Sequence, residues 1–183
     1  DSSPDGHTAF VNSFLKNYPE ICKDRNIVVC DCTWLKDPDH DKSLRSHLGT
    51  HHQTYKRVVQ NPAFTKVCKP LRHLRSDKKN LVINACKSGR HRAVTITDVQ
   101  EAVMRKNLYD NDGHIVETYH LQAETHWGHL CDAECQHCNS SSEKHKVSKE
   151  QGYNMLKDIV PQGPKRPRLQ AAAKPMSKKA PAP

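Results

Sequence analysis

The chain has 183 residues, 35% of them hydrophobic, and a formal net charge of +9, which suits one domain with a core and polar extensions. After residue 160 there are six cations and no acid, so the rest of the chain is only mildly basic and nucleic-acid binding is permitted without being required. No apolar run approaches the ~20 residues that span a bilayer, and there is no signal-peptide core. We expect an intracellular protein, cytoplasmic or nuclear, with no membrane partner. Because the chain begins at Asp1 instead of Met, we expect a processed product or an excerpt of a longer protein.

The eight cysteines are irregularly spaced, and disulfides suit secreted domains. Cys30 and Cys32 lie two apart on a predicted strand and point to opposite faces, which argues against a bridge between them. We expect reduced thiols.

The first third of the chain predicts a helix, a strand and an acidic turn. Apolar residues at 10, 11, 14 and 15 share one helical face, and residues 26–32 read as a strand with Asp31 at its end, where ligand-facing residues of α/β sheets gather. An Asp-rich turn around Pro38 follows. Asp41 and Arg45 lie four apart, so a surface ion pair is an alternative to a binding role for Arg45. Residues 50–61 read as a helix, and an apolar stripe runs from residue 64 to residue 74.

The next strand, loop and helix carry the densest chemistry in the chain. Residues 81–83 form an apolar run typical of a buried strand, and residues 94–104 have close to helical apolar spacing. Between them lie a thiol, a hydroxyl, a glycine and several cations: Cys86, Lys87, Ser88, Gly89, Arg90, His91 and Arg92. A helix N-terminus offers unpaired N–H groups, and glycine lets the backbone approach a ligand closely. We expect a phosphate to bind here; the plain alternative is an ordinary turn with solvated cations.

Cys86 and Arg92 also satisfy the Cys-x5-Arg pattern of cysteine-dependent phosphatases. In these enzymes a thiolate attacks phosphorus while the arginine holds the phosphate oxygens. Asp31 or Asp41 would then be the acid. However, Ala85 and Ala93 stand where such enzymes usually carry a histidine and a hydroxyl residue.

The following segment alternates polar and apolar residues over 114–121, which predicts a third strand containing His120. Long helical connections between the strands favour parallel pairing. Ser140–Lys149 reads as a polar linker, residues 152–160 as a short helix, and residues 161–183 as a disordered basic tail, which includes a Lys/Arg/Pro stretch typical of a nuclear import signal or a nucleic-acid arm.

Three cysteines and three histidines lie within residues 126–138. Their density predicts tetrahedral zinc bound by Cys131, Cys135 and Cys138 with His129 as fourth ligand; His126 and His120 are alternatives. Cys-x3-Cys-x2-Cys is also an iron–sulfur signature of radical enzymes, but too little chain follows it for their barrel. Free thiols on a loop remain the plain alternative.

The loop sequence Ala-Cys-Lys-Ser-Gly-Arg-His-Arg-Ala-Val at residues 85–94 resembles the Gly-Cys-Thr-Gly-Gly-Lys-His-Arg-Ser-Val signature of the RapZ (RNase adapter) family, in its C-terminal domain. Four upstream elements follow that family's order: Asp31-Cys32-Thr33, Asp37-Pro38, Asp41-Lys42-Ser43-Leu44-Arg45 and Gly49. His120 matches a family histidine, whereas Thr33 and Leu121 replace family arginines. The resemblance covers roughly residues 26–122.

This resemblance implies an α/β fold like a phosphofructokinase subdomain. Bacterial members bind small regulatory RNA, sense glucosamine-6-phosphate and deliver RNA to a ribonuclease. The resemblance implies a phosphate pocket made of Cys86, Ser88, Gly89, His91 and Arg92, with Asp31, Arg45 and His120 nearby. It also implies that Lys87 and Arg90 contact an RNA backbone.

We therefore expect a small, open, mostly parallel sheet with flanking helices. The expected divisions are an N-terminal helix and leader (1–25), the α/β domain (26–122), a Cys/His-rich extension with a short helix (123–160) and the tail (161–183). We expect a domain, non-enzymatic on balance, that binds a phosphosugar or nucleotide and has RNA as a further candidate partner. The alternatives are a phosphatase using Cys86 and a zinc-stabilised interaction module.

Overall fold

The computed structural model describes residues 4–109, 116–120, 126–127, 135, 138 and 143–163. The predicted zinc ligands Cys131 and His129, and the tail from residue 164 onward, lie outside the described residues. No helix within the described ranges is long and apolar enough to cross a membrane.

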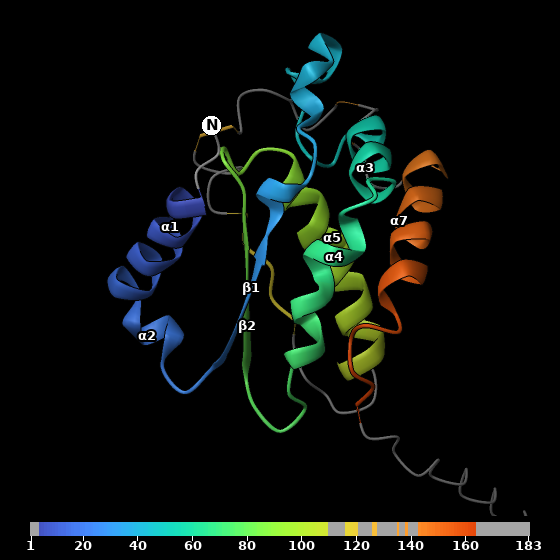
Figure 1. Cartoon of the computed structure of the whole chain (residues 1–183). Helices are drawn as coiled ribbons and strands as arrows, with labels where there is room; N and C mark the ends of the chain where they lie inside the picture. The colour runs from blue at the N-terminus through green and yellow to red at the C-terminus, as the bar shows by residue number, and fades with distance from the viewer. Residues whose placement is uncertain are drawn as a thin grey trace, which may run out of the picture.

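Two parallel strands form the sheet, as the sequence predicts. β1 (Asn26–Asp31) pairs with β2 (Asn80–Ala85) in a register that sets Val28 beside Val82 and Asp31 beside Ala85. Because both strands run the same way, the segments that follow them begin at the same edge of the sheet (Figure 1). This confirms the predicted α/β class with a small, open, parallel sheet.

Helices cover the sheet on two sides (Figure 1). α1 (Pro4–Asn17) and α2 (Pro19–Cys22) lie on one side, and α1 contacts β2. On the other side lie α3 (His52–Val59), α4 (Phe64–Cys68), α5 (Arg92–Met104) and α7 (Glu143–Leu156). The main core lies among these four helices and β1, and its buried side chains include Val28, Tyr55, Val59, Phe64, Val67, Leu71, Ile96, Val99, Val103 and Leu156.

The acidic segment after β1 folds into three short 3-10 turns, η1 (Cys32–Trp34), η2 (Pro38–His40) and η3 (Lys42–Leu44). Each begins at an aspartate whose carboxylate accepts the backbone N–H two residues on: Asp31 from Thr33, Asp37 from Asp39 and Asp41 from Ser43. Short polar side chains stabilise turns in this way. Two further short elements, η4 (Lys69–His73) and the π-helical turn η5 (Arg105–Tyr109), extend α4 and α5.

The prediction of a third strand is wrong for residues 116–120, which contain no strand. This segment is held instead by side chains of α5 and η5. Arg105 donates to the carbonyl of Val116 at 2.8 Å, and the Thr118 hydroxyl donates to Glu101 at 2.9 Å. The alternating pattern therefore reflects a segment lying along a helix.

The prediction of a polar linker at Ser140–Lys149 is also wrong from residue 143, because α7 starts at Glu143 and ends at Leu156. Its buried positions are His145, Ser148, Gly152 and Leu156. They have helical spacing, but only Leu156 has a large apolar side chain, so the periodicity of hydrophobic residues did not reveal the helix. Small residues on this face let α7 approach α3 and α5 closely.

Candidate anion-binding site

The loop between β2 and α5 is folded back on itself at its glycine. Gly89 has φ 63°, a left-handed conformation that glycine adopts without strain. Its N–H donates to Cys86 Sγ at 3.2 Å. The Gly49 N–H donates to the Arg90 carbonyl at 2.9 Å, so the loop is also tied to the segment before α3. α5 begins at Arg92, and its first amides face the same end of the sheet as the loop.

Arg90 and Arg92 are held by the acidic turn η2 and its cap. Arg90 Nη2 donates to both carboxylate oxygens of Asp39. Arg92 is 6% exposed and donates to Asp37 at 2.9 Å and to the Leu35 carbonyl at 2.9 Å. Two of the loop's cations are therefore neutralised by protein carboxylates, and Arg92 is committed to the protein interior.

His91 joins the same network from the other side of the loop. Its ring is 2% exposed, Nε2 lies 2.9 Å from the His47 carbonyl oxygen, and Nδ1 lies 3.2 Å from an Asp39 oxygen. The neighbouring His91 imidazole, the backbone N–H of Asp39 and the nearby Arg92 charge lower the pKa of Asp37 to about 2. Asp37 therefore stays ionised, and its charge stabilises the buried guanidinium.

A cavity of about 540 Å³ opens beside this loop, between α1 and α2 on one side and β2 and α5 on the other. Phe10, Phe14, Tyr18 and Ile21 form its apolar wall on the side of α1 and α2, and apolar residues of β2 and α5 face them. Its polar lining includes Asn84, Thr97, Gln100, Thr118 and His120, and the loop contributes Cys86 and Gly89. An apolar wall with a few polar groups at one end is typical of a small-molecule site.

The structure separates the predicted site residues into three groups. Cys86, Gly89 and His120 line the cavity, where His120 Nε2 lies 3.6 Å from Asp98. Lys87 is exposed at the loop, and the Ser88 carbonyl accepts from the Trp127 indole N–H at 2.8 Å. The other predicted residues, namely Asp31, Arg45, Arg90, His91 and Arg92, contact the turns after β1 or the His47 carbonyl.

The proposed surface pair of Asp41 with Arg45 does not form. Asp41 pairs with Arg57 at 2.6 Å, and Arg45 Nε donates to the Asp39 carbonyl at 3.0 Å. Arg45 therefore helps to position Asp39, whose carboxylate pairs with Arg90.

Sequence reasoning missed two parts of this site. Asp37 was assigned to a turn and to a family element, and Asp39 to the turn alone, but neither was predicted to pair with the arginines of the loop. Phe10 and Tyr18 line the cavity and are 43% and 44% exposed, whereas the helical pattern had placed Phe10 on a core-facing side. A periodic pattern does not distinguish a core face from a cavity wall.

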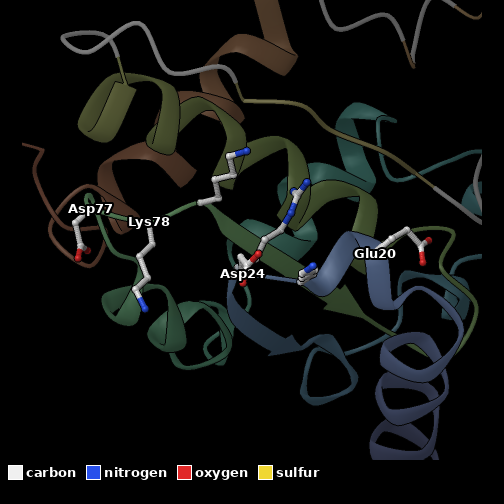
Figure 2. Close-up of a pocket in the computed structure, with 7 residues that line it drawn as sticks. Glu20, Asp24, Asp77 and Lys78 are labelled. Atoms are coloured by element: carbon white, nitrogen blue, oxygen red, sulfur yellow. The ribbon is translucent and has the colours of Figure 1, made fainter.

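A second hollow, of about 730 Å³, lies at the amino ends of the two strands, far from the loop (Figure 2). In this view Asp77 and Lys78 lie on one side, Glu20 on the other and Asp24 between them. Lys23, Arg25 and Lys79 complete its lining. Charges of both signs surround it, so it offers no concentrated positive field for an anion, and ligands of parallel sheets bind at the opposite, carboxyl end.

The strand, glycine-containing loop, helix N-terminus and adjoining cavity together form an α/β domain with a candidate anion-binding site. The family model of the RapZ C-terminal domain matches residues 8–124, from within α1 to the segment after His120. The chain belongs to this family of regulatory, phosphosugar-sensing domains. No curated protein and no solved structure gave a match. The family match ends before α7.

Proposed function

We propose that this domain binds a phosphorylated small molecule, a phosphosugar or a nucleotide, without chemical turnover. The observation that carries the proposal is the position of the cavity: it opens on Cys86 and Gly89, next to the first turn of α5. An anion there meets the positive end of a helix, while the rest of the ligand has an enclosed space beside it. Family membership supports the same class of ligand.

The two ends of the cavity suit the two ends of such a ligand. The phosphate would lie against the loop backbone, close to the exposed Lys87. Hydroxyl or amide groups of the ligand would bond to Thr97 and His120. The apolar face of the ligand would pack on Phe14 of α1 and on Tyr18, which precedes α2. Arg90 and Arg92 act mainly through Asp39 and Asp37, by holding the loop in shape.

The phosphatase alternative is weaker because its phosphate clamp is committed elsewhere. Arg92 donates to Asp37 and to the carbonyl of Leu35, so its guanidinium points to the turns after β1. Asp31, one of the two candidate acids, caps η1, and Asp41 pairs with Arg57. A phosphatase would need Arg92 to leave a buried ion pair, which costs several kcal/mol.

A binding panel tests the proposal. Glucosamine-6-phosphate, other phosphosugars and nucleotides are titrated into the wild type, Lys87→Ala and Lys79→Ala, and product formation is measured in parallel. The two variants lose the same charge at exposed positions, at the loop and at the opposite end of the sheet respectively. We expect saturable binding that weakens about 3- to 10-fold in Lys87→Ala and stays unchanged in Lys79→Ala, since an exposed charge contributes roughly 1 kcal/mol.

Two further arms separate the alternatives. Phosphoester hydrolysis that disappears in Cys86→Ser would replace the proposal with the phosphatase. RNA is added as competitor: displacement of the small ligand would place RNA at the same loop, and equal weakening in both lysine variants would reject the loop as the site.

A further inference from the structure

The extension beyond the family match returns to the domain beside the anion-binding loop. The indole N–H of Trp127 donates to the Ser88 carbonyl at 2.8 Å, and the Arg90 guanidinium lies 4.9 Å from the Trp127 ring centroid. Cys135 and Cys138 lie against His47, whose own carbonyl oxygen contacts His91 Nε2. Residues far apart in sequence therefore meet on one side of the loop.

The three side chains His47, Cys135 and Cys138 have the geometry of metal ligands. His47 Nδ1 lies 3.7 Å from Cys135 Sγ and 3.5 Å from Cys138 Sγ, and the three ligand atoms all lie within 4.8 Å of one another. Tetrahedral zinc with its usual Zn–S and Zn–N bond lengths sets a sulfur and a nitrogen ligand about 3.6 Å apart. The observed separations match this value.

The local backbone also presents both thiols together. The Cys138 N–H donates to the Cys135 carbonyl at 3.0 Å, which closes a turn between two cysteines in Cys-x2-Cys spacing. Neither cysteine is in a disulfide bond. The other described cluster of candidate ligands, Asp37, Asp39 and His91, differs because Arg90 and Arg92 already neutralise its carboxylates.

We propose that His47, Cys135 and Cys138 bind a structural zinc ion that fastens the extension to the anion-binding loop. Two thiolates and an imidazole suit zinc, and a water molecule or one further ligand completes the tetrahedron. The ion joins His47 to Cys135 and Cys138, which follow it in the sequence by 88 and 91 positions. It therefore holds Trp127 over Ser88 and Arg90. His47 is the new element, because a cluster read from residues 126–138 alone does not include it.

Metal content tests the site directly and does not depend on any phosphate ligand. The full chain is purified under reducing conditions, and bound zinc is measured with cobalt substitution as a spectroscopic probe. We expect one zinc per chain and a thiolate-to-cobalt charge-transfer band. Both are lost in Cys135→Ser, and zinc affinity falls by more than about 100-fold in His47→Ala, since even indirect contacts to a site contribute 10- to 100-fold.

Two variants guard against misfolding as the explanation. His52→Ala removes a neighbouring imidazole outside the cluster and should keep full zinc content. His47→Cys supplies a third thiolate and should keep metal while raising the charge-transfer band by about half. Full zinc content in His47→Ala, or a Cys135–Cys138 disulfide with no metal bound under the same conditions, would overturn the proposal.

Tryptophan fluorescence reports on the position of the extension. The chain has two tryptophans, so a Trp34→Phe background leaves Trp127 as the reporter. Chelation should shift Trp127 emission to longer wavelength, because the indole leaves the loop for water. An unchanged spectrum after complete zinc removal would show that the metal does not hold the extension in place.

Discussion

The ion pairs of Asp37 with Arg92 and of Asp39 with Arg90 fix the orientation of both arginine side chains. A surface arginine at a helix start would be a simple phosphate ligand, but Arg92 is 6% exposed and bonded to Asp37. A buried guanidinium needs such a partner, because an unpaired charge in the interior costs several kcal/mol. The acids therefore stabilise the loop, and neither arginine is free to act as a simple phosphate ligand.

The pKa of Asp37 gives a pH prediction for stability. Its folded-state pKa of about 2 lies below the ordinary value of 3.8. The stabilisation is therefore fully present above about pH 4 and is lost as pH falls toward 2. Allowing for its partial exposure, we expect roughly 1–2 kcal/mol of the free energy of unfolding to disappear over this window. Urea unfolding at several pH values measures this loss in the wild type and in Asp37→Asn, which lacks the titrating carboxyl group and should not show the loss. Free energies of unfolding that fall equally with pH in both proteins would contradict the prediction.

Gly49 gives a second prediction at this scale. A Cβ atom there would meet the His91 carbonyl oxygen, Val94 Cβ at 2.7 Å and Thr95 N at 2.9 Å, so backbone would have to move. We expect Gly49→Ala to lower the free energy of unfolding by about 3 kcal/mol or more. In Gly152→Ala the new Cβ would meet Val99 Cγ1 at 2.9 Å, so a buried side chain must shift, but no backbone atom is in the way and the helix gains about 1 kcal/mol of propensity. We therefore expect a clearly smaller loss in Gly152→Ala than in Gly49→Ala. Equal losses in the two variants would contradict the special role of Gly49.

At the scale of elements, α7 belongs to the core although it lies outside the family match. It contacts α3, α4 and α5, and Leu156 is fully buried while Val147 is 60% exposed. We expect Leu156→Ala to lower the free energy of unfolding by about 2–4 kcal/mol, and Val147→Ala by less than about 0.5 kcal/mol. Thermal and urea unfolding measure both. A small loss in Leu156→Ala would mean that α7 is peripheral.

The elements also show what sequence patterns can predict. β1, β2, α3 and α5 were predictable because each combines apolar spacing with clear boundary residues. The last turn of α7 overlaps the short helix predicted at residues 152–160. The first part of α7 was missed because its inward face carries His145 and Ser148, which no hydrophobic pattern marks. The segment 116–120 was mistaken for a strand because alternation alone does not distinguish strand pairing from contact with a helix.

The site, too, has residues that the sequence motif predicted and contacts that depend on the tertiary fold. Cys86, Gly89 and His120 were predicted from their motif and do line one cavity. The orientation of the Arg90 and Arg92 side chains depends on two acids, Asp39 and Asp37, which lie about fifty residues upstream. His47 meets Cys135 and Cys138 only through the tertiary fold. Neither relation follows from local spacing.

For the whole molecule, three segments meet around the cavity and the loop that follows β2. α1 and α2 supply the apolar wall of the cavity, the acidic turns fix the loop, and Trp127 contacts the loop from the extension. The hollow in Figure 2 lies at the amino ends of the strands and has charges of both signs. We therefore propose that the ligand binds in the cavity beside the loop and not in this hollow.

Amide shift mapping by NMR locates the bound ligand residue by residue. Glucosamine-6-phosphate, the tightest-binding nucleotide of the panel and inorganic phosphate are titrated into the labelled full chain. We expect saturable shifts at Gly89, Ala93, Thr97 and His120, with Asp24 and Lys78 unchanged. Saturable shifts confined to the hollow around Asp24 and Lys78, or none at the loop with any of the three ligands, would contradict it.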